Sequence, residues 1–298
     1  MDGFPRSEVG GLSVPRLICG SNCFYGCSHT SKARDRTLQE MFDTPSKVAK
    51  VAEVFARHGC NAYMSDPDEF TSQVLREVEQ RVGVEMLWIA TPLTETASAD
   101  ADDQWKRAVE KTKRLGARFC FPHGDMTDSL LDRVNRRLTP RLRNCLRFVS
   151  EMGMIPGLST HSPESIIYTD NDPEAEVATY LQPYNSAGFL CQVETDWIQH
   201  IIENAHRPVI AIKPLAAGRL LPPTGLAFVW NTLRDCDMVT IGTMSSYEAE
   251  ECIELSLSVL ENRYPNVELQ RTRSKRRLIT AEATGRQSEA DEQQRGRE

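Results

Sequence analysis

Three histidines and one lysine are the residues best suited to chemistry: His29, His123, His161 and Lys213. Imidazole titrates near neutral pH, so these histidines could act as general acids and bases. Neutral imidazole also binds Zn, Mn or Fe, which makes His29, His123 and His161 candidate ligands of a divalent metal. A lysine withdrawn from water has a lowered pKa and can act as a base or form a Schiff base. We predict His123, His161 and Lys213 as catalytic residues, and the metal-bound and metal-free sites both stay open.

Carboxylates accompany these residues. Asp125 follows His123 by two positions and could orient its imidazole, whereas Asp128 is expected to order the same loop. Asp66 stands directly before Pro67, and a capping oxygen before a proline is typical of a helix N-terminus. We therefore expect Asp66 to cap a helix, with a place beside the histidines in a metal site as the alternative.

The nine cysteines are expected to be reduced thiols of a cytoplasmic protein. Their number is odd, and the stretch from Met1 to Gly11 shows no signal-peptide pattern. Cys19, Cys23 and Cys27 have the spacing C-x₃-C-x₃-C, one residue longer than the C-x₃-C-x₂-C of radical S-adenosylmethionine barrels. Because three thiolates must converge on one cluster, we expect buried or incidental thiols and no iron–sulfur cluster.

The elements that must position these side chains alternate in type along the chain. Short apolar, β-branched runs predict strands, and amphipathic stretches between them predict helices. Eight strands in strict alternation with helices predict a parallel sheet closed into a (β/α)₈ barrel of the α/β class. The predicted strands are Arg16–Gly20, Cys60–Met64, Met86–Ala90, Arg118–Phe121, Met154–Ser159, Val177–Gln182, Val209–Leu215 and Met238–Gly242. The predicted helices are Ser46–His58, Phe70–Val82, Asp102–Leu115, Arg141–Met152, Asp196–Ala205, Gly225–Arg234 and Ser246–Glu261, with Pro163–Glu176 as the weakest helical pattern.

Signals at the helix ends agree with this division. Capping oxygens stand directly before a proline in three places, and one further pair has capping-box spacing. Glycines follow four helical patterns, where a left-handed C-cap is wanted. The capping residues are Thr44, Asp66, Ser162 and Ser245 (with Glu248), and the glycines are Gly59, Gly83, Gly116 and Gly153. Because the active site of such a barrel lies at the C-terminal ends of the strands, His29, His123 and His161 fall on its catalytic face.

Length and composition fit one barrel with a tail. A (β/α)₈ barrel takes about 250 residues, and this chain has 298, of which 40% are hydrophobic and 26% charged. We predict a barrel over residues 1–262 and a charged, disordered tail over residues 263–298, since its far part has few apolar residues to bury. The alternative for the basic cluster from Arg271 to Arg277 is contact with an anionic partner.

The predicted partner is a small-molecule substrate. A net charge of −7 argues against nucleic-acid binding, because phosphate contact needs a basic face. No apolar run approaches the length of a membrane span. The sequence leaves the oligomeric state open.

Motifs at the strand ends follow the order found in aldo/keto reductases, and the resemblance covers roughly residues 11 to 260. Residues 11–17 resemble the hairpin that closes the bottom of that barrel. Gly157–His161 is similar to the family's strand-five segment, and Gln182–Asn185 to its Gln-x-x-Tyr-Asn. Pro214–Gly218, at strand seven, is the most specific match. Such reductases take hydride from a nicotinamide and use a Tyr proton donor supported by Asp, Lys and His.

One of these four catalytic positions is retained. The resemblance assigns the family's His to His123, but Met64 stands at the Asp position and Phe70 near the Tyr position. Thr91–Pro92 occupies the Lys position. Without the Tyr and Lys pair, no obvious acid protonates an alkoxide as hydride arrives. This argues against ordinary aldehyde reduction.

The residues that bind the cofactor in this family are better retained here than the catalytic residues. Ser159 and Gln182 stand where the family binds the nicotinamide carboxamide, and Asn185 belongs to the same strand-six motif. The loops after strands seven and eight are the usual phosphate site of such barrels. There Arg219 offers a guanidinium, and the helix start at Ser245 offers backbone N–H groups, to a phosphate or carboxylate.

A second, looser resemblance is to uncharacterised bacterial barrels related to aldo/keto reductases. In these an Asn and a downstream His follow strand one, as Asn22 and His29 do here. A Lys also precedes Leu-Ala-Ala-Gly at strand seven, which is the place of Lys213. We include Asn22 among the candidate cofactor-binding residues, although this pattern implies no established chemistry.

These observations predict an enzyme of open class. The first hypothesis is acid/base chemistry, with or without a metal, of isomerase, lyase or hydrolase type on a small polar carbonyl or sugar-like substrate. The second is an NAD(P)-dependent oxidoreductase in which His123 or His161 replaces the Tyr. The third is a catalytically inactive barrel that acts as a binding protein. Of the cofactors, a divalent metal is expected ahead of NAD(P).

Overall fold

The eight predicted apolar runs form a parallel barrel in the computed structural model, which describes residues 3–268 and residue 270. The strands are β3 (Leu17–Gly20), β4 (Ala62–Ser65), β5 (Leu87–Ala90), β6 (Phe119–Cys120), β9 (Ile155–Pro156), β10 (Leu158–Ser159), β11 (Tyr180–Pro183), β12 (Val209–Ile212) and β13 (Met238–Ile241). Their hydrogen-bonded order is β10-β11-β12-β13-β3-β4-β5-β6-β9, and every neighbouring pair is parallel.

The two ends of this order belong to one interrupted strand. Gly157 separates β9, which pairs with β6, from β10, which pairs with β11. A Cβ at Gly157 would lie 2.2 Å from a ring carbon of Phe121, so only glycine leaves room for that ring. The predicted (β/α)₈ barrel is therefore confirmed, and it closes at a strand broken into two short halves.

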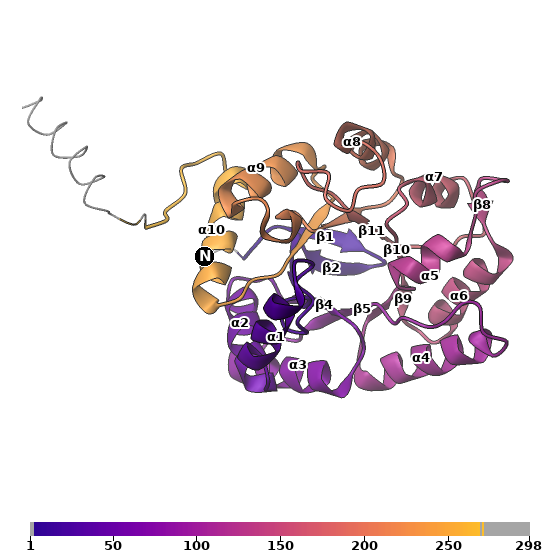
Figure 1. Ribbon diagram of the computed structural model, residues 1–298, viewed down its shortest axis with the longest axis horizontal. Helices are drawn as coiled ribbons and strands as arrows, with labels where there is room; N and C mark the ends of the chain where they lie inside the picture. Colours follow the sequence, from indigo (N-terminus) through magenta and orange to yellow (C-terminus); the bar gives the residue numbers. More distant parts are fainter. Residues whose placement is uncertain (1–2, 269, 271–298) are drawn as a thin grey trace, which may run out of the picture. The chain divides into compact units, whose positions relative to one another are not determined.

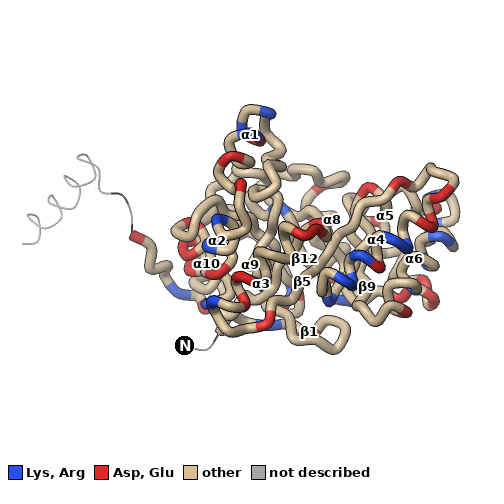
Figure 2. Tube along the Cα trace, turned by 90° about the horizontal axis from the view of Figure 1, so that it is seen from below, with Lys and Arg blue, Asp and Glu red and all other residues tan. Residues whose placement is uncertain are grey.

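Alternate residues of the strands point inward and form the core. Ile18, Met64, Ile89 and Ile210 are buried there together with Val14 from an N-terminal hairpin. This hairpin joins β1 (Arg6–Val9) to β2 (Leu12–Pro15) in antiparallel register. It closes one end of the barrel, as predicted, and Figure 2 shows β1 and α1 (Lys32–Met41) at opposite ends.

Helices surround the strands in a ring (Figure 1). They are α2 (Pro45–Arg57), α3 (Glu69–Val82), α4 (Ala101–Leu115), α6 (Pro140–Glu151), α7 (Glu164–Asp170), α8 (Thr195–Asn204), α9 (Pro222–Thr232) and α10 (Ser246–Leu260). Each buries an apolar stripe against the barrel; in α2 this stripe includes Val48, Val51 and Phe55. The four predicted C-terminal glycines all have positive φ: Gly59, Gly83, Gly116 and Gly153.

Two predicted helix caps were wrong. The N-cap of α3 is Asp68 and not Asp66, because the Asp68 carboxylate accepts the backbone N–H of Thr71 at 2.7 Å. Ser162 does not cap α7, whose N-cap is Pro163. The Ser162 hydroxyl has other hydrogen-bond partners. Thr44 is the N-cap of α2 but makes no capping hydrogen bond. The Ser245 cap of α10 is confirmed.

Several elements were not predicted. These are α1, the short helix α5 (Gly124–Ser129), the turn of 3₁₀ helix Ala216–Gly218, and the hairpin of β7 (Leu131–Asp132) with β8 (Arg137–Leu138). The sequence of α1 is almost entirely polar, and Leu38 is its buried residue. It therefore lacks the periodic apolar stripe that predicts a helix.

The barrel belongs to a compact unit that covers Met1–Pro265, and a second unit covers Asn266–Glu298. Most of the predicted tail over residues 263–298, including its basic cluster, lies outside the described residues. Among the residues that the structure describes, no helix is both long and apolar enough to cross a membrane.

Candidate functional site

A carboxylate of α5 holds the histidine that follows β10. The Nδ1 atom of His161 lies 3.3 Å from Oδ2 of Asp128, and the backbone N–H of His161 donates to the same oxygen at 3.1 Å. The hydroxyl of Thr160 donates to Oδ1 at 2.6 Å, and the backbone N–H of Ser162 donates there at 3.3 Å. Asp128 therefore fixes both the loop and the ring of His161.

The pKa of the Asp128 carboxyl is lowered. Desolvation favours its neutral form, but the hydrogen bonds from His161 and Thr160 outweigh that cost. Asp128 is thus a carboxylate at neutral pH and accepts a hydrogen bond from the Nδ1–H group of His161. In this tautomer Nε2 of His161 is the basic nitrogen.

The imidazole of His161 rests on a glycine. A Cβ at Gly124 would lie 2.8 Å from both Cε1 and Nδ1 of His161, and 3.6 Å from Oγ of Ser159. Real Cβ atoms do not approach so closely, so any larger residue at position 124 displaces the ring. Ser159, predicted to bind a nicotinamide, is almost fully buried beside this contact.

A second histidine shares a carboxylate with the first. Oδ2 of Asp125 lies 3.7 Å from Nδ1 of His123, and Oδ1 lies 3.9 Å from Nδ1 of His161. The backbone N–H of Asp125 donates to Nδ1 of His123 at 3.3 Å, which leaves the proton of this imidazole on Nε2. The group that orients His123 is therefore this N–H, with the exposed carboxylate further away.

Asp66 joins the site from the end of β4. Desolvation raises the pKa of its carboxyl, while the nearby His123 and the hydroxyl of Thr91 oppose this rise. The Thr91 hydroxyl donates to Oδ1 of Asp66 at 3.4 Å. Asp66, which does not cap α3, thus lies among the candidate catalytic residues.

Lys213 is the first residue after β12 and has a left-handed backbone, with φ of +61°. Desolvation lowers the pKa of its amine, and the charges of Asp125 and Cys191 oppose the shift. Within residues 3–268 no carboxylate lies within ion-pair distance of its Nζ atom. A cation in this state is unusual, because buried charges are normally paired.

The loop after β3 brings His29 to the same place. Burial lowers the pKa of His29, and the positive charges of Lys213 and Arg219 lower it further. Nδ2 of Asn22 lies 3.3 Å from Nε2 of His29, so Asn22 orients the ring and is itself exposed. Both residues lie at the mouth, as predicted.

Arg219 ties three loops together. Its guanidinium lies 4.0 Å from the centroid of the Phe189 ring, and it donates to the backbone oxygens of Ala216 at 3.0 Å and His29 at 3.3 Å. Asn185 in turn holds Phe189 through both backbone groups, at 2.9 and 3.0 Å. The buried Asn185 side chain is thus used inside its own loop.

Two other predicted cofactor-binding residues are not free to contact a cofactor: Gln182 is buried, and Ser245 is hydrogen-bonded within its own helix. Gln182 is fully buried; by strand alternation it faces outward with Tyr180 and Tyr184, both of which contact outer elements. Ser245 accepts the backbone N–H of Glu248 at 3.1 Å, and the Glu248 carboxylate accepts the N–H of Met244 at 2.8 Å. The N-terminus of α10 is therefore filled by a negative side chain of this chain.

The predicted metal ligands do not form a metal centre. The described part of the chain contains no group of three or more His, Cys, Asp or Glu side chains that could hold a metal ion. His29, His123 and His161 all lie at the mouth, but their nearest polar partners differ: these are the Asn22 amide, the Asp125 backbone N–H and the Asp128 carboxylate, respectively. Of the cysteines at strand one, Cys19 is buried, Cys23 is half-buried and Cys27 is exposed.

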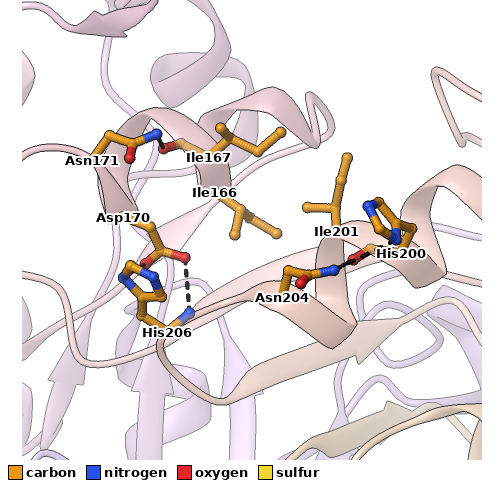
Figure 3. Close-up of a pocket in the computed structure, with 8 residues that line it drawn as sticks. All are labelled: Ile166, Ile167, Asp170, Asn171, His200, Ile201, Asn204 and His206. Atoms are coloured by element: carbon orange, nitrogen blue, oxygen red, sulfur yellow. Dashed lines mark hydrogen bonds and ion pairs between the residues drawn. The ribbon is translucent and has the colours of Figure 1, made fainter.

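Two hollows adjoin the barrel. One, of about 590 Å³, lies between the β3 loop and α1 and is lined by Cys27, His29, Lys32 and Arg36 among others. The other, of about 180 Å³, lies between α7 and α8 (Figure 3). Asp170 borders it and is already bonded to the backbone of His206 at 2.8 Å. The first of these hollows shares His29 with the mouth and extends the candidate site.

Sequence patterns did not identify Gly124 or Phe189, and they gave Asp128 only the ordering of its loop. Asp128 and His161 lie 33 residues apart on consecutive loops, so no local spacing connects them. Phe189 acts through its stacking on Arg219, which a sequence pattern does not reveal.

No family model and no curated protein matches the chain. Among solved structures, a protein of Pseudomonas aeruginosa assigned as an aldo-keto reductase covers 87% of this chain and 99% of its own, with a TM-score of 0.61 and 15% identity. An aldo-keto reductase of Bombyx mori in complex with NADP covers 90% and 96%, with a TM-score of 0.59 and 11% identity. The holo form of one from Bacillus halodurans covers 90% and 99%, with a TM-score of 0.56 and 12% identity. The fold is therefore that of a divergent aldo/keto reductase-like barrel.

Proposed function

We propose that this barrel is an enzyme that moves protons beside a carbonyl group, with His161 as general base. The reaction class is isomerase or lyase, and the substrate is a small polar carbonyl or sugar-like compound. The supporting observation is the hydrogen-bonded pair of Asp128 and His161, set on Gly124 at the mouth of the barrel. An ionised carboxylate behind an imidazole fixes its tautomer and stabilises the imidazolium formed when the base takes a proton.

His123 is the complementary acid. Its Nδ1 accepts the backbone N–H of Asp125, so its Nε2 carries a proton that can be given to a substrate oxygen. Nε2 of His161, in contrast, carries the lone pair that takes a proton from carbon. His161 as base and His123 as acid lie on either side of the Asp125 carboxylate. One imidazole can therefore take a proton from carbon while the other gives a proton to oxygen, and the roles reverse in the reverse reaction. Each such group contributes about 10²–10⁴-fold to a rate.

Lys213 supplies positive charge close to the reacting groups. It is largely desolvated, and its charge interacts with that of Asp125, which lies between the two histidines. A cation in a site of low dielectric favours a substrate that carries negative charge or develops it during the reaction. This chemistry needs no metal, in keeping with histidines that are turned to separate partners.

The test is deuterium exchange. The purified chain is incubated in D₂O with short α-hydroxy aldehydes and ketones, both neutral and anionic, and ¹H NMR follows the signal of the hydrogen beside the carbonyl. The proposal expects catalysed exchange with at least one compound. His161→Gln should lower the exchange rate by about 10²–10⁴-fold.

His200→Gln is the matched control, because His200 is exposed on α8 and lies outside the site. It should exchange at the wild-type rate. Catalysis that survives His161→Gln unchanged, or a wild-type chain that exchanges no member of the series, would contradict the proposal. The second outcome would favour a barrel that binds a ligand without catalysis.

The second candidate is an NAD(P)-dependent oxidoreductase, favoured by the NADP complex of the Bombyx mori protein with the same fold. The residues present fit a nicotinamide dinucleotide poorly. Gln182 is enclosed on the outer side of its strand, and the Glu248 carboxylate fills the α10 terminus where a phosphate would bind. Fluorescence titration with NADPH tests this candidate; saturable binding below millimolar concentration would restore it.

A further inference from the structure

Two cations on the loop after β12 have no acidic partner. Neither Lys213 nor Arg219 has a carboxylate within 4.0 Å among the described residues. Lys213 is half-buried, and the other half-buried cations among the described residues have acidic partners: Arg234, for example, lies 2.7 Å from Asp237, and Arg207 lies 2.9 Å from Asp170. Lys213 therefore differs from the other half-buried cations, and the exposed Arg219 adds a second positive charge to the same loop.

The unpaired charge of Lys213 has a cost that a ligand could remove. Desolvation lowers the pKa of its amine, which is the sign of a cation deprived of water without full compensation. Asp125 acts on it only from beyond ion-pair distance, and the Asp125 side chain is 70% exposed. A bound anion would replace the lost solvation and pair with the amine.

Arg219 is held in one position with donors to spare. A guanidinium carries five N–H groups, and the two backbone oxygens of Ala216 and His29 each accept one hydrogen bond. Stacking on Phe189 fixes its plane, and Asn185 fixes Phe189. A planar, immobilised guanidinium suits a carboxylate or phosphate, because little side-chain entropy is lost on binding.

The anion site is distinct from the helix terminus usually used in such barrels. At the start of α10 the Glu248 carboxylate accepts the Met244 N–H, and the Ser245 hydroxyl accepts the N–H of Glu248. A phosphate there would meet a carboxylate at close range. The positive charge of the mouth lies instead on the β12 loop, beside His29 and the 590 Å³ hollow that His29 lines.

We propose that the substrate carries a fixed anionic group, a carboxylate or a phosphate, which binds between the Lys213 amine and the Arg219 guanidinium. This deepens the proposed function, on which it rests, by naming the substrate class of the same site. The anionic end is held on the β12 loop while the carbonyl end lies near His161 and His123. The hydroxyl-bearing part between them spans the mouth.

Anion binding is measured on the full chain by isothermal titration calorimetry, separately with inorganic phosphate and with acetate. One anion should saturate the wild-type protein at millimolar concentration or below. Lys213→Met and Arg219→Gln should each weaken that binding at least tenfold, and Lys213→Arg should retain most of it. Tighter phosphate identifies a phosphorylated substrate, and tighter acetate a carboxylic acid; either supports the proposal.

Lys111→Met is the matched control, since Lys111 is exposed on α4. This variant should bind the anion with the affinity of the wild type. Circular dichroism and thermal unfolding establish that each variant is folded. Failure of both anions to saturate, or binding that both site substitutions leave unchanged, overturns the proposal. This failure is separable from that of the proposed function, because anion binding needs no turnover. Deuterium exchange without anion binding overturns the anion site alone, and binding without exchange overturns the chemistry alone.

Discussion

The Cα atom of Gly124 stands directly against the imidazole of His161, with room for a hydrogen atom but not for a methyl group. A Cβ at this position would lie 2.8 Å from Nδ1, the atom that faces Asp128. No other residue type leaves the ring where it is. The glycine that follows His123 is therefore part of the site, although it has no functional group.

Gly124→Ala should lower the deuterium-exchange rate about a hundredfold, because a shift near 1 Å in a catalytic group costs roughly that much. Gly124 does not have the left-handed backbone that strains an alanine, so the effect comes from the contact with His161. Gly83→Ala is the control with the opposite properties: its φ is +75° and nothing lies within 4 Å of its Cβ. It should cost about 1 kcal/mol of stability and leave the rate unchanged. Equal rates in the two variants would argue against His161 as the base.

Asp128→Asn should lower the free energy of unfolding by about 1–3 kcal/mol at neutral pH, because it weakens hydrogen bonds to a largely but not fully buried carboxylate. The pKa of Asp128 is lower in the folded chain than its usual value near 4. As the pH falls from about 4 through the folded pKa, the wild type loses the stability that the ionised carboxylate contributes. Asp128→Asn lacks this contribution at every pH.

Urea denaturation at neutral and acidic pH measures this difference, with Asp125→Asn as the matched control. The Asp125 side chain is 70% exposed against 17% for Asp128, so its variant should unfold much as the wild type does. A gap between wild type and Asp128→Asn that stays constant from neutral pH to acid would be inconsistent with the lowered pKa.

Anion binding should weaken at alkaline pH, at a lower pH than an ordinary lysine would give. Desolvation lowers the pKa of Lys213, while Asp125 and Cys191 oppose the shift, so the amine loses its charge earlier as the pH rises. The guanidinium of Lys213→Arg stays protonated throughout this range. Calorimetry across the alkaline range should show a decline in the wild type that is absent in Lys213→Arg. Parallel declines would assign the titration to another group.

Phe189→Leu should weaken anion binding about three- to tenfold, because Arg219 loses the ring that fixes its plane, a contact worth about 0.5–1 kcal/mol or more. The effect belongs to binding and not to folding, since Phe189 is a loop residue held by Asn185. Val193→Ala is a suitable comparison, because Val193 is an exposed apolar residue nearby in the chain. Affinity that is the same in all three proteins would remove Phe189 from the site.

Most of the barrel could be predicted because its signals are local. Apolar runs such as Leu87–Ala90 and Val209–Ile212 are buried on both faces, and glycines such as Gly83 end helices by a backbone conformation that other residues avoid. The helix α1 gave no such signal. Its ten residues bury one apolar side chain, and the Ser31 cap alone does not distinguish a helix from a turn.

The residue types of the candidate site could be predicted from the sequence, but the contacts between these residues could not. His29, His161 and Lys213 could be assigned to the mouth once the strands were numbered. Which carboxylate contacts which imidazole depends on the register of consecutive loops. Spacing paired Asp125 with His123 and gave no partner for His161, which the structure places against Asp128. The same limit explains Asp66, because two acidic residues precede α3 and only hydrogen bonding selects Asp68 as the cap.

The interruption of the strand at Gly157 affects which part of the barrel unfolds locally first. β9 and β10 each contribute two paired residues to the barrel, and the loop with His161 follows the second of them. Few backbone hydrogen bonds hold this seam, so its amides should exchange with solvent sooner than those of β4 and β12. His161, the proposed general base, therefore lies at the point where the barrel closes. Ligands that bridge the β10 and β12 loops will protect the seam, which makes amide exchange a reporter of substrate binding even before turnover is observed.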